Sequence, residues 1–434
     1  MFIKRIQLGL IHVALTVTLL PITSTLNRVM IADLSLSATL VAVLASLPYL
    51  FSPIQVAIGN FSDRNPVLGW RRSPYILIGL ILCTAGLIVS PHMAYLLAEN
   101  LGMGIAVGVF AFGLWGMGYN FATVSYFSLA SELSGEKSRG RTIAIMFIMM
   151  VLSIVATSEG LSRLLQNFSP DILFSAFNSV AFVAFGLGLL GLIGLEPRHS
   201  EAAHLDEHYT WREMYEGLRE NRQVLLFFRY LILILIAVLG QDVLLEPYSA
   251  QLYDLPVSAS TRLNSITGTF TLISLVVGSL LERKVSNPVQ ARIGAWMGVG
   301  AFSLILVSGF MHSTMLFYVA LSVLGLATGL ITVSNLALML DMTVAERVGM
   351  FMGVWGMANA ASRLAGNLIS GALRDGLSQL TGNLVFGYQA VFGIELIMLL
   401  VSLYLLRSID VARFRDQAEK QFSYIEKAAM AGDA

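Results

Sequence analysis

The chain has 434 residues, of which 56% are hydrophobic and only 12% are charged, and its mean hydropathy is +0.74. Soluble domains carry about a quarter charged residues, so this composition excludes an ordinary soluble protein and indicates one that crosses a membrane several times. The 27 basic residues balance the 27 acidic ones, which leaves no bulk charge for binding nucleic acid. The single cysteine, Cys83, excludes an internal disulfide.

Apolar runs of about 20 residues predict the membrane-spanning helices. The first run is too long for the core of a signal peptide, so we interpret it as the first span. Twelve spans can be placed along the chain, near 6–31, 37–61, 74–97, 101–130, 141–166, 171–195, 223–248, 260–281, 290–311, 314–340, 348–373 and 384–406. Lysine and arginine concentrate in the connections on the side of the N-terminus, which predicts that both termini are cytoplasmic.

A repeated pattern indicates two related halves. Gly59, Asp63 and Arg64 follow the second span with the spacing Gly-x-x-x-Asp-Arg. The pattern recurs after the eighth span, offset by 219 residues, as Gly278, Glu282 and Arg283. Two six-helix halves of the same topology are typical of major facilitator transporters. We therefore expect an all-α membrane protein with that fold, divided into a first half (1–195), a cytoplasmic linker (196–222), a second half (223–407) and a cytoplasmic tail (408–434).

The loop after the second span resembles the corresponding loop of major facilitator proteins, through Gly59 to Arg64 and the following Gly69-Trp70-Arg71-Arg72. In that family the loop holds the two halves together in one state, which implies that Asp63 docks near the start of the eleventh span. A helix N-terminus there would favour an anion. The alternative is that the arginines Arg64, Arg71 and Arg72 only anchor the loop at the cytoplasmic face.

Three fragments point to a narrower family: Leu26-Asn27-Arg28-Val29-Met30-Ile31, Gly69-Trp70-Arg71-Arg72-Ser73-Pro74-Tyr75-Ile76 and Gln241-Asp242-Val243-Leu244-Leu245-Glu246-Pro247-Tyr248. Together they resemble the bacteriochlorophyll-delivery branch of the major facilitator superfamily, with its PucC- and LhaA-like members. The resemblance implies a carrier or assembly factor for light-harvesting or photosystem complexes, with (bacterio)chlorophyll as its cargo. It also implies antenna or photosystem subunits and chlorophyll-synthesis proteins as partners, and a photosynthetic inner membrane, cytoplasmic or thylakoid, as the location.

The third fragment places two carboxylates within or beside the seventh span, where they are costly and mark functional sites. Asp242 and Glu246 are four residues apart and are therefore predicted on one helix face. The 219-residue offset aligns Asn27 with Glu246, so Arg28 is expected at the same depth, opposite the carboxylates. This arrangement could be an outer gate, a proton site or a structural latch. Alternatively, the fragment is a helix end at the lipid headgroups.

Other charges within the spans also need partners. Glu159 and Arg163 are spaced to pair along one helix. Arg363, in the eleventh span, is expected to bridge to Glu395 in the twelfth, or alternatively to face the cavity between the halves. With Gln241 of the third fragment, these residues complete the predicted cavity or gate.

Two further features lie outside this set. In the linker, Trp211, Tyr215 and Leu218 share one face of a predicted interfacial helix that would lie on the membrane or on a partner. His12, in the inner part of the first span, could ligate a chlorophyll magnesium, and so could His92 or His312 at the outer rim, although lone histidines in helices are usually only hydrogen-bonded.

The sequence shows no nucleophile–base constellation, phosphate loop or metal cluster, so we expect neither an enzyme nor a catalytic cofactor. Two other function classes remain open beside pigment handling. One is a proton-coupled secondary transporter of a small solute, and the other is a non-transporting membrane scaffold. Pigment handling and scaffolding both predict co-purifying pigment-protein subunits, whereas solute transport predicts none.

Overall fold

The computed structural model describes residues 2–134, 139–198, 222–282, 284–342 and 348–414, apart from the side chains of residues 56, 60, 63, 139, 140 and 348–353. The helices of the first half are α1 (Phe2–Leu20), α2 (Ala38–Leu50), α3 (Ile54–Arg64), α4 (Ser73–Glu99), α5 (Leu101–Ser134), α6 (Arg139–Leu164) and α7 (Pro170–Leu192). Those of the second half are α9 (Arg222–Leu239), α10 (Leu245–Tyr253), α11 (Val257–Leu281), α12 (Asn287–Phe310), α13 (Thr314–Asp341), α14 (Val348–Thr381) and α15 (Leu384–Leu406).

Within the described residues, ten helical segments are long and apolar enough to cross a membrane. The predicted span 37–61 is instead two helices, α2 and α3, separated by a turn at residues 51–53 that includes Pro53, which lacks the N–H needed to continue the helix. The predicted span 348–373 corresponds to α14, which carries Arg363 and further polar residues along its length. The all-helical membrane fold is confirmed, and the count of twelve spans stays a prediction.

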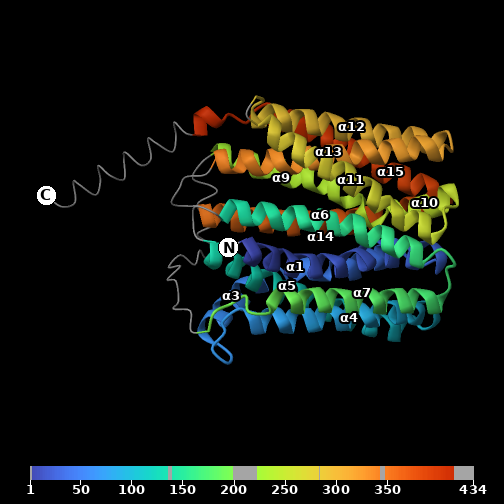
Figure 1. The fold of residues 1–434 in the computed structure, drawn as a ribbon. Coiled ribbons are helices and arrows are strands. Elements are labelled where there is room, and N and C mark those ends of the chain that lie inside the picture. Colours follow the sequence, from blue (N-terminus) through green and yellow to red (C-terminus); the bar gives the residue numbers. More distant parts are fainter. Residues whose placement is uncertain (1, 135–138, 199–221, 283, 343–347, 415–434) are drawn as a thin grey trace.

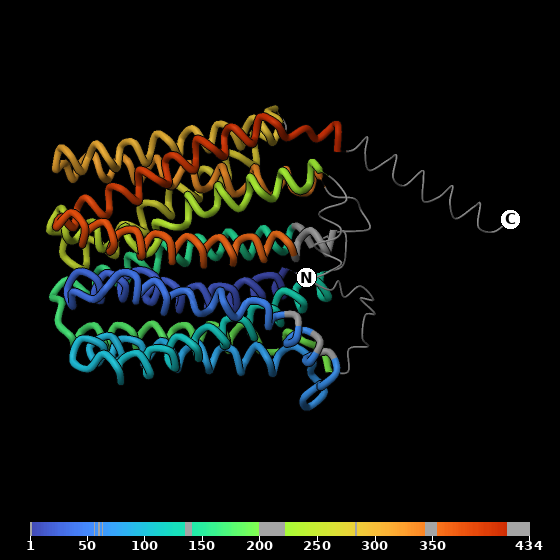
Figure 2. The backbone as a smooth tube through the Cα atoms, turned by 180° about the vertical axis from the view of Figure 1, so that it is seen from behind, coloured from blue at the N-terminus to red at the C-terminus, as the bar shows by residue number. Residues whose placement is uncertain are grey.

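The helices lie side by side with their long axes nearly aligned (Figures 1 and 2). Helices α1–α7 pack mainly on one another, and so do α9–α15. Two helix pairs carry most of the packing between these groups, α6 with α11 and α2 with α14. The exact boundaries of the halves remain a prediction, and Trp211, Tyr215 and Leu218 of the predicted linker helix lie outside the described residues.

The start of α1 and the end of α15 lie at the same end of the bundle, which we call the terminal end (Figure 1). The opposite end, where α10 lies, is the distal end (Figure 1). An even number of crossings places the two chain ends on one side of a membrane. The structure therefore agrees with a shared side for the termini, while the identity of that side remains a prediction.

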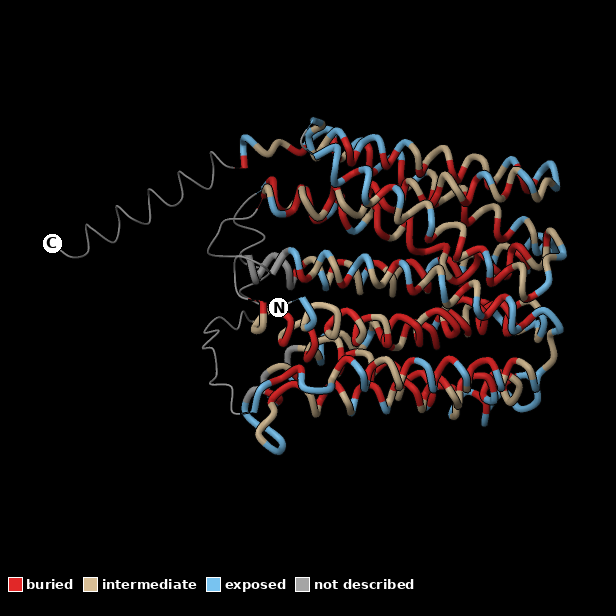
Figure 3. Tube along the Cα trace, in the orientation of Figure 1, coloured by how far each residue is buried: buried red, intermediate tan, exposed pale blue. Residues whose placement is uncertain are grey.

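Buried residues gather where helices face one another, and exposed residues lie on the outside of the bundle and at its ends (Figure 3). The outside is itself apolar, with Phe182, Phe310 and Tyr404 each about 70% exposed. Such a surface suits contact with lipid and not with water. The bundle is thus a membrane protein by its surface as well as by the length of its helices.

Small residues set the closest helix contacts. A Cβ atom on Gly79 of α4 would lie 2.6 Å from backbone atoms of Ala122 and Gly118 in α5, and a Cβ on Gly118 would lie 2.6 Å from the backbone of Cys83 and Gly79. Only glycine permits this backbone approach, which is how membrane helices gain packing energy without a hydrophobic driving force. The glycine-rich α5 is therefore fixed closely against α4.

Candidate functional site

Helix α1 does not continue as a regular α-helix through the membrane. After Leu20 it forms two π-helical segments, η1 (Pro21–Leu26) and η2 (Val29–Asp33). Pro21 lacks the N–H that would continue the α-helical pattern, and single-turn π segments are frequent at functional sites. The polar residues of this stretch are thereby turned toward the second half of the bundle.

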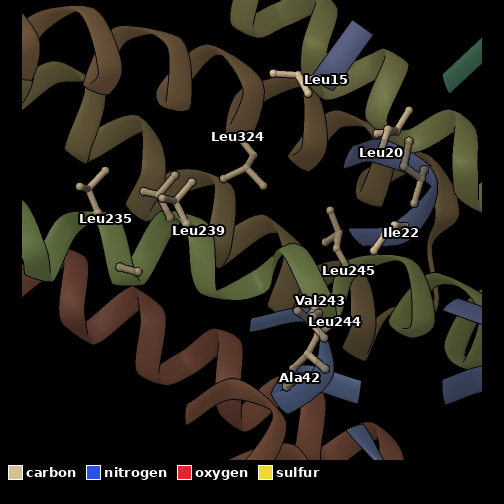
Figure 4. Close-up of a cluster of buried hydrophobic side chains, with 14 of the residues drawn as sticks. Leu15, Leu20, Ile22, Ala42, Leu235, Leu239, Val243, Leu244, Leu245 and Leu324 are labelled. Atoms are coloured by element: carbon tan, nitrogen blue, oxygen red, sulfur yellow. The ribbon is translucent and has the colours of Figure 1, made fainter. Parts of the chain in front are cut away.

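The facing stretch of the second half is also irregular. Helix α9 ends at Leu239, the 3₁₀ segment η4 (Gly240–Val243) follows, and α10 begins at Leu245. Asp242 and Glu246 therefore lie on two different segments, and the prediction that they share one helix face is wrong. The regular 3.6-residue period on which it relied is interrupted between them. Figure 4 shows the side chains of this break in one buried cluster with Ile22 of η1 and Ala42 of α2.

Glu246 joins the two halves at the centre of their contact. Its Oε1 accepts hydrogen bonds from the Ser24 hydroxyl of η1 and from the Asn264 amide of α11. Beside it, the hydroxyls of Thr25 and Thr261 lie 3.1 Å apart. Glu246 is 3% exposed, and its Oε2 has no hydrogen-bond partner in the described structure. The carboxyl group is held by neutral groups from both halves.

Arg28 forms no described ion pair with Asp242 or Glu246, so the predicted ion pair is wrong, although Arg28 lies within electrostatic reach of Glu246. Its Nη1 forms an ion pair with Asp33, and its Nη2 donates to the carbonyl of Leu255 at 3.1 Å. The π-helical turn explains the change, because its i to i+5 pattern brings residue 33 beside residue 28. The neighbouring Asn27 is buried and bonds locally, donating to the carbonyl of Thr23 at 2.6 Å.

Asp242 is paired with Arg363 of α14, at 2.9 Å from its Oδ2 to Nη1. Gln241 donates to the other oxygen of Asp242 at 2.9 Å. Both charged side chains are about one-third exposed, although they lie inside the bundle. The guanidinium lies 5.9 Å from the ring centre of Tyr49 in α2, and Tyr119 of α5 is within electrostatic reach. Arg363 therefore lies between the halves, against aromatic residues of the first one.

Glu395 is not the countercharge of Arg363, and that prediction is wrong. Its Oε1 accepts a hydrogen bond from Ser370 at 3.3 Å, and the side chain is 3% exposed. Glu395 lies against Gly240, whose added Cβ would be 3.0 Å from Oε1. The 3₁₀ segment places Asp242 nearer to Arg363, so the helix break decides the pairing.

At the distal end, Asp375 of α14 caps the first turn of α2. Its carboxylate accepts hydrogen bonds from Ser37 Oγ at 2.7 Å, from Thr39 Oγ1 at 2.8 Å and from the N–H groups of Ala38 and Thr39 at 3.2 and 2.8 Å. Arg374 completes the site with an ion pair to Asp375 at 2.8 Å. A carboxylate at a helix N-terminus satisfies free N–H groups and complements the helix dipole. We call this contact the distal clamp.

Glu159 forms the predicted bridge to Arg163, with 3.1 Å between Oε1 and Nε. It also pairs with Arg262 of α11, at 3.0 Å, and so links α6 to the other half. The i, i+4 spacing identified the first partner, whereas the second partner depends on the packing of α6 against α11 and has no signal in the sequence.

At the terminal end, the loop between α3 and α4 is held within the first half. Arg71 and Arg72 pair with Glu132 of α5 at 3.1 and 3.2 Å, and Arg72 also donates to Ser62 at 2.7 Å. Glu196, at the start of the predicted linker, accepts hydrogen bonds from the backbone N–H groups of residues 71, 72 and 73 at 2.7–3.2 Å. The arginines therefore form buried contacts in addition to any anchoring at the membrane surface.

The predicted docking of Asp63 on the eleventh span lies outside the described side chains, as does Arg283 of the repeated pattern. Gly59 is half-buried, at 3.5 Å between an added Cβ and Val124. Arg64 and Glu282 are exposed. The latch role of this loop therefore stays a prediction.

The polar contacts between the halves are unevenly distributed among the described residues. They run from Arg363 over Tyr49, through Glu246 and Glu159, to the distal clamp. At the terminal end, the described pairs Arg5–Thr142 and Arg72–Glu132 each stay within one half. The halves are thus joined from the middle of the bundle to its distal end.

The family model described as "PUCC protein" matches residues 25–414. The chain belongs to the PucC family. Protein PucC of Rhodobacter capsulatus is 29% identical to this PucC-family chain over 421 residues, covering 92% of this chain and 90% of that protein. The "Bacteriochlorophyll synthase 44.5 kDa chain" of Rhodobacter capsulatus is 24% identical, covering 95% and 96%.

Among solved structures, a bacterial homologue of the human lysosomal transporter Spinster, in an inward-facing and unoccupied conformation, aligns with a TM-score of 0.70. It covers 95% of this chain and 97% of its own, at 12% identity. At that identity the likeness shows the fold alone. It confirms the major facilitator fold predicted for this PucC-family protein.

Proposed function

We propose that this protein is a non-enzymatic membrane carrier or assembly factor that handles (bacterio)chlorophyll and promotes assembly of light-harvesting or photosystem complexes. Its location would be the photosynthetic inner membrane, with both termini cytoplasmic and with antenna or photosystem subunits as partners. Membership of the PucC family supports this role, as does full-length similarity to a relative named as a bacteriochlorophyll synthase chain.

The observation that carries the proposal is the Arg363–Asp242 pair. It is about one-third exposed between the halves and lies against Tyr49. A guanidinium has five N–H donors, and the one ion pair with Asp242 leaves several of them for a ligand. Aromatic rings beside it offer a large apolar contact. Such a site suits a large apolar molecule with a carbonyl or carboxylate substituent, which describes a chlorophyll-type pigment.

A second candidate, a proton-coupled carrier of a small solute, is favoured by a different observation. Glu246 and Glu395 are both 3% exposed, and each has one oxygen without a hydrogen-bond partner in the described structure. Neither forms an ion pair with a described basic residue. Buried carboxyl groups of this kind within membrane helices are typical of proton pathways.

The test is to purify the protein from its native membrane under mild conditions and to record its absorption spectrum and its co-purifying subunits. We expect bound pigment and antenna or photosystem subunits. Arg363→Leu should lose most of the pigment, whereas Arg292→Leu, at an exposed position of α12, should retain it. A wild-type protein free of pigment and of pigment-binding subunits, in cells whose antenna assembles normally without it, would refute the proposal.

A further inference from the structure

His12 of α1 is a buried base that forms none of the contacts described so far. It is 6% exposed, and neither ring nitrogen makes a hydrogen bond to a described residue. The nitrogen Nδ1 is fully enclosed, whereas Nε2 is not. Leaving a buried polar group unsatisfied costs about 1–3 kcal/mol. An unpartnered imidazole inside a helix bundle therefore requires an explanation.

Aromatic rings surround the imidazole. Its ring centre lies 5.3 Å from Tyr126 and 5.8 Å from Phe127, both of α5, and 5.5 Å from Phe147 of α6. Tyr126 and Phe127 contact each other at 4.5 Å between ring centres. Phe147 is 38% exposed, so this aromatic cluster reaches the surface of the helices. We call these three rings with His12 the aromatic site.

The aromatic surroundings select one form of the imidazole. An N–H group pointing at an aromatic ring is attracted to its electron-rich face, whereas a nitrogen lone pair is repelled by it. The tautomer with its proton on the enclosed Nδ1 leaves the lone pair on Nε2. A neutral imidazole with a free Nε2 is a common metal ligand in proteins.

The surroundings also restrict which metal fits. Among the described residues there is no group of three or more His, Cys, Asp or Glu that could hold a bare metal ion. A single histidine suits a metal that arrives with its other ligands in place. A tetrapyrrole supplies four ring nitrogens and leaves an axial position open, and its flat ring matches aromatic side chains.

The aromatic site lies nearer to the terminal end than the described polar contacts between α6 and α11. Phe147 precedes Val155, whose carbonyl accepts a hydrogen bond from Ser265 of α11, by eight residues. At 1.5 Å per residue this is about 12 Å closer to the terminal end. The exposed edge of Phe147 is therefore separated along α6 from the hydrogen bond that joins Val155 to the second half.

We propose that His12 Nε2 is the axial ligand of a magnesium tetrapyrrole that packs against Tyr126, Phe127 and Phe147. This inference rests on the proposed function and specifies one of its binding sites. It predicts that binding depends on the metal and not only on the macrocycle.

The test is a titration of the purified protein in lipid nanodiscs with bacteriochlorophyll a and with bacteriopheophytin a, its metal-free form. Binding is followed by tryptophan fluorescence, and metal coordination is followed by resonance Raman spectroscopy. We expect the wild type to bind the magnesium form at least about tenfold more tightly, with a five-coordinate metal. His12→Leu should bind the two forms equally. His92→Leu is the control, because His92 is exposed and stacks on Phe174 near the distal end.

The outcomes separate the two proposals. If His12→Leu keeps the preference for magnesium, His12 is not the ligand, while the pigment-handling function stands. If the wild type binds neither pigment, both proposals fail. Should His12→Leu not fold, His12→Ala with added imidazole replaces it. Failure of imidazole to restore the preference in that folded variant would overturn the assignment.

Discussion

Substitution of Asp375 by alanine should release the distal end of the bundle. This carboxylate accepts four hydrogen bonds from residues 37–39 of the first half, and its side chain is only 12% exposed. Asp375 belongs to α14 in the second half, so each of these bonds spans the two halves. Their loss should destabilise the arrangement in which the distal ends are held together, while each half keeps its own packing.

The expected magnitude follows from the kind of bond. A hydrogen bond to a charged group contributes about 1.5–3 kcal/mol, but bonds to one carboxylate are not additive. Loss of a helix N-cap costs about 0.5–2 kcal/mol by itself. Water can replace part of the contact at this end of the bundle, so we expect about 2–4 kcal/mol in total. At 1.4 kcal/mol per factor of ten, the population should shift by about 30-fold to 700-fold.

The assay measures the distance between spin labels on cysteines at Leu101 and Leu380, which are exposed near the distal ends of α5 and α14. Cys83 is buried and will not compete for the label. In Asp375→Ala a population with longer distances should appear. Asp171→Ala removes an exposed carboxylate from the first turn of α7 and serves as the control. Identical distance distributions in the two folded variants would refute the clamp.

Two other predictions concern pairs whose contacts the structure defines. Arg28→Met and Asp33→Asn should show a coupling of about 1 kcal/mol in a double-mutant cycle of unfolding in detergent. Arg28→Met and Glu246→Gln should show a smaller coupling, because these two side chains are within electrostatic reach but form no ion pair. The reverse order would contradict the described ion pair. Gly118→Ala should lower the melting temperature clearly, because its Cβ would lie 2.6 Å from the backbone of α4, whereas Gly113→Ala meets nothing within 4 Å and gains helix propensity. Equal effects at the two glycines would show that close packing of α4 and α5 is not what fixes residue 118.

Local patterns in the sequence were sufficient to predict the fold and one ion pair, Glu159–Arg163. Apolar runs of membrane length predicted the helices, and three short fragments predicted the family. The bridge between Glu159 and Arg163 followed from i, i+4 spacing on a regular helix. These features depend on residues within one or two helical turns, which is the range over which a sequence pattern determines geometry.

The partners of the central charges could not be predicted in the same way. The assignment of Arg28 to Glu246, and of Arg363 to Glu395, assumed regular helices on both sides. The π-helical segments after α1 bring Arg28 beside Asp33, so that these two form an ion pair. The 3₁₀ segment that begins at Gly240 brings Asp242 beside Arg363. In the sequence, Pro21 was the signal of the π-helical segments, and Gly240 was the signal of the 3₁₀ segment.

The clamp residue Asp375 was missed for a simpler reason. The predicted eleventh span ended at residue 373, whereas α14 continues to Thr381. A charged pair directly after a long apolar run, Arg374-Asp375, is the signal that would have found it. Glu196 was likewise placed in the linker, although its carboxylate caps the start of α4. In both cases the partner is a helix N-terminus far away in the chain.

The contact around Gly240 also constrains how this family can vary. An added Cβ there would lie 3.0 Å from Glu395 Oε1 and 3.1 Å from Ser370 Oγ, and one on Gly366 would lie 2.9 Å from the Cα of Gly240. Residues of η4, α14 and α15 therefore share one small volume, which has no room for a larger side chain at position 240 or 366. A larger residue at position 240 would need room, so a relative that carries one should have smaller residues at 370 or 395 and keep glycine at 366. Covariation between positions 240, 370 and 395 would mark where η4, α14 and α15 pack against one another.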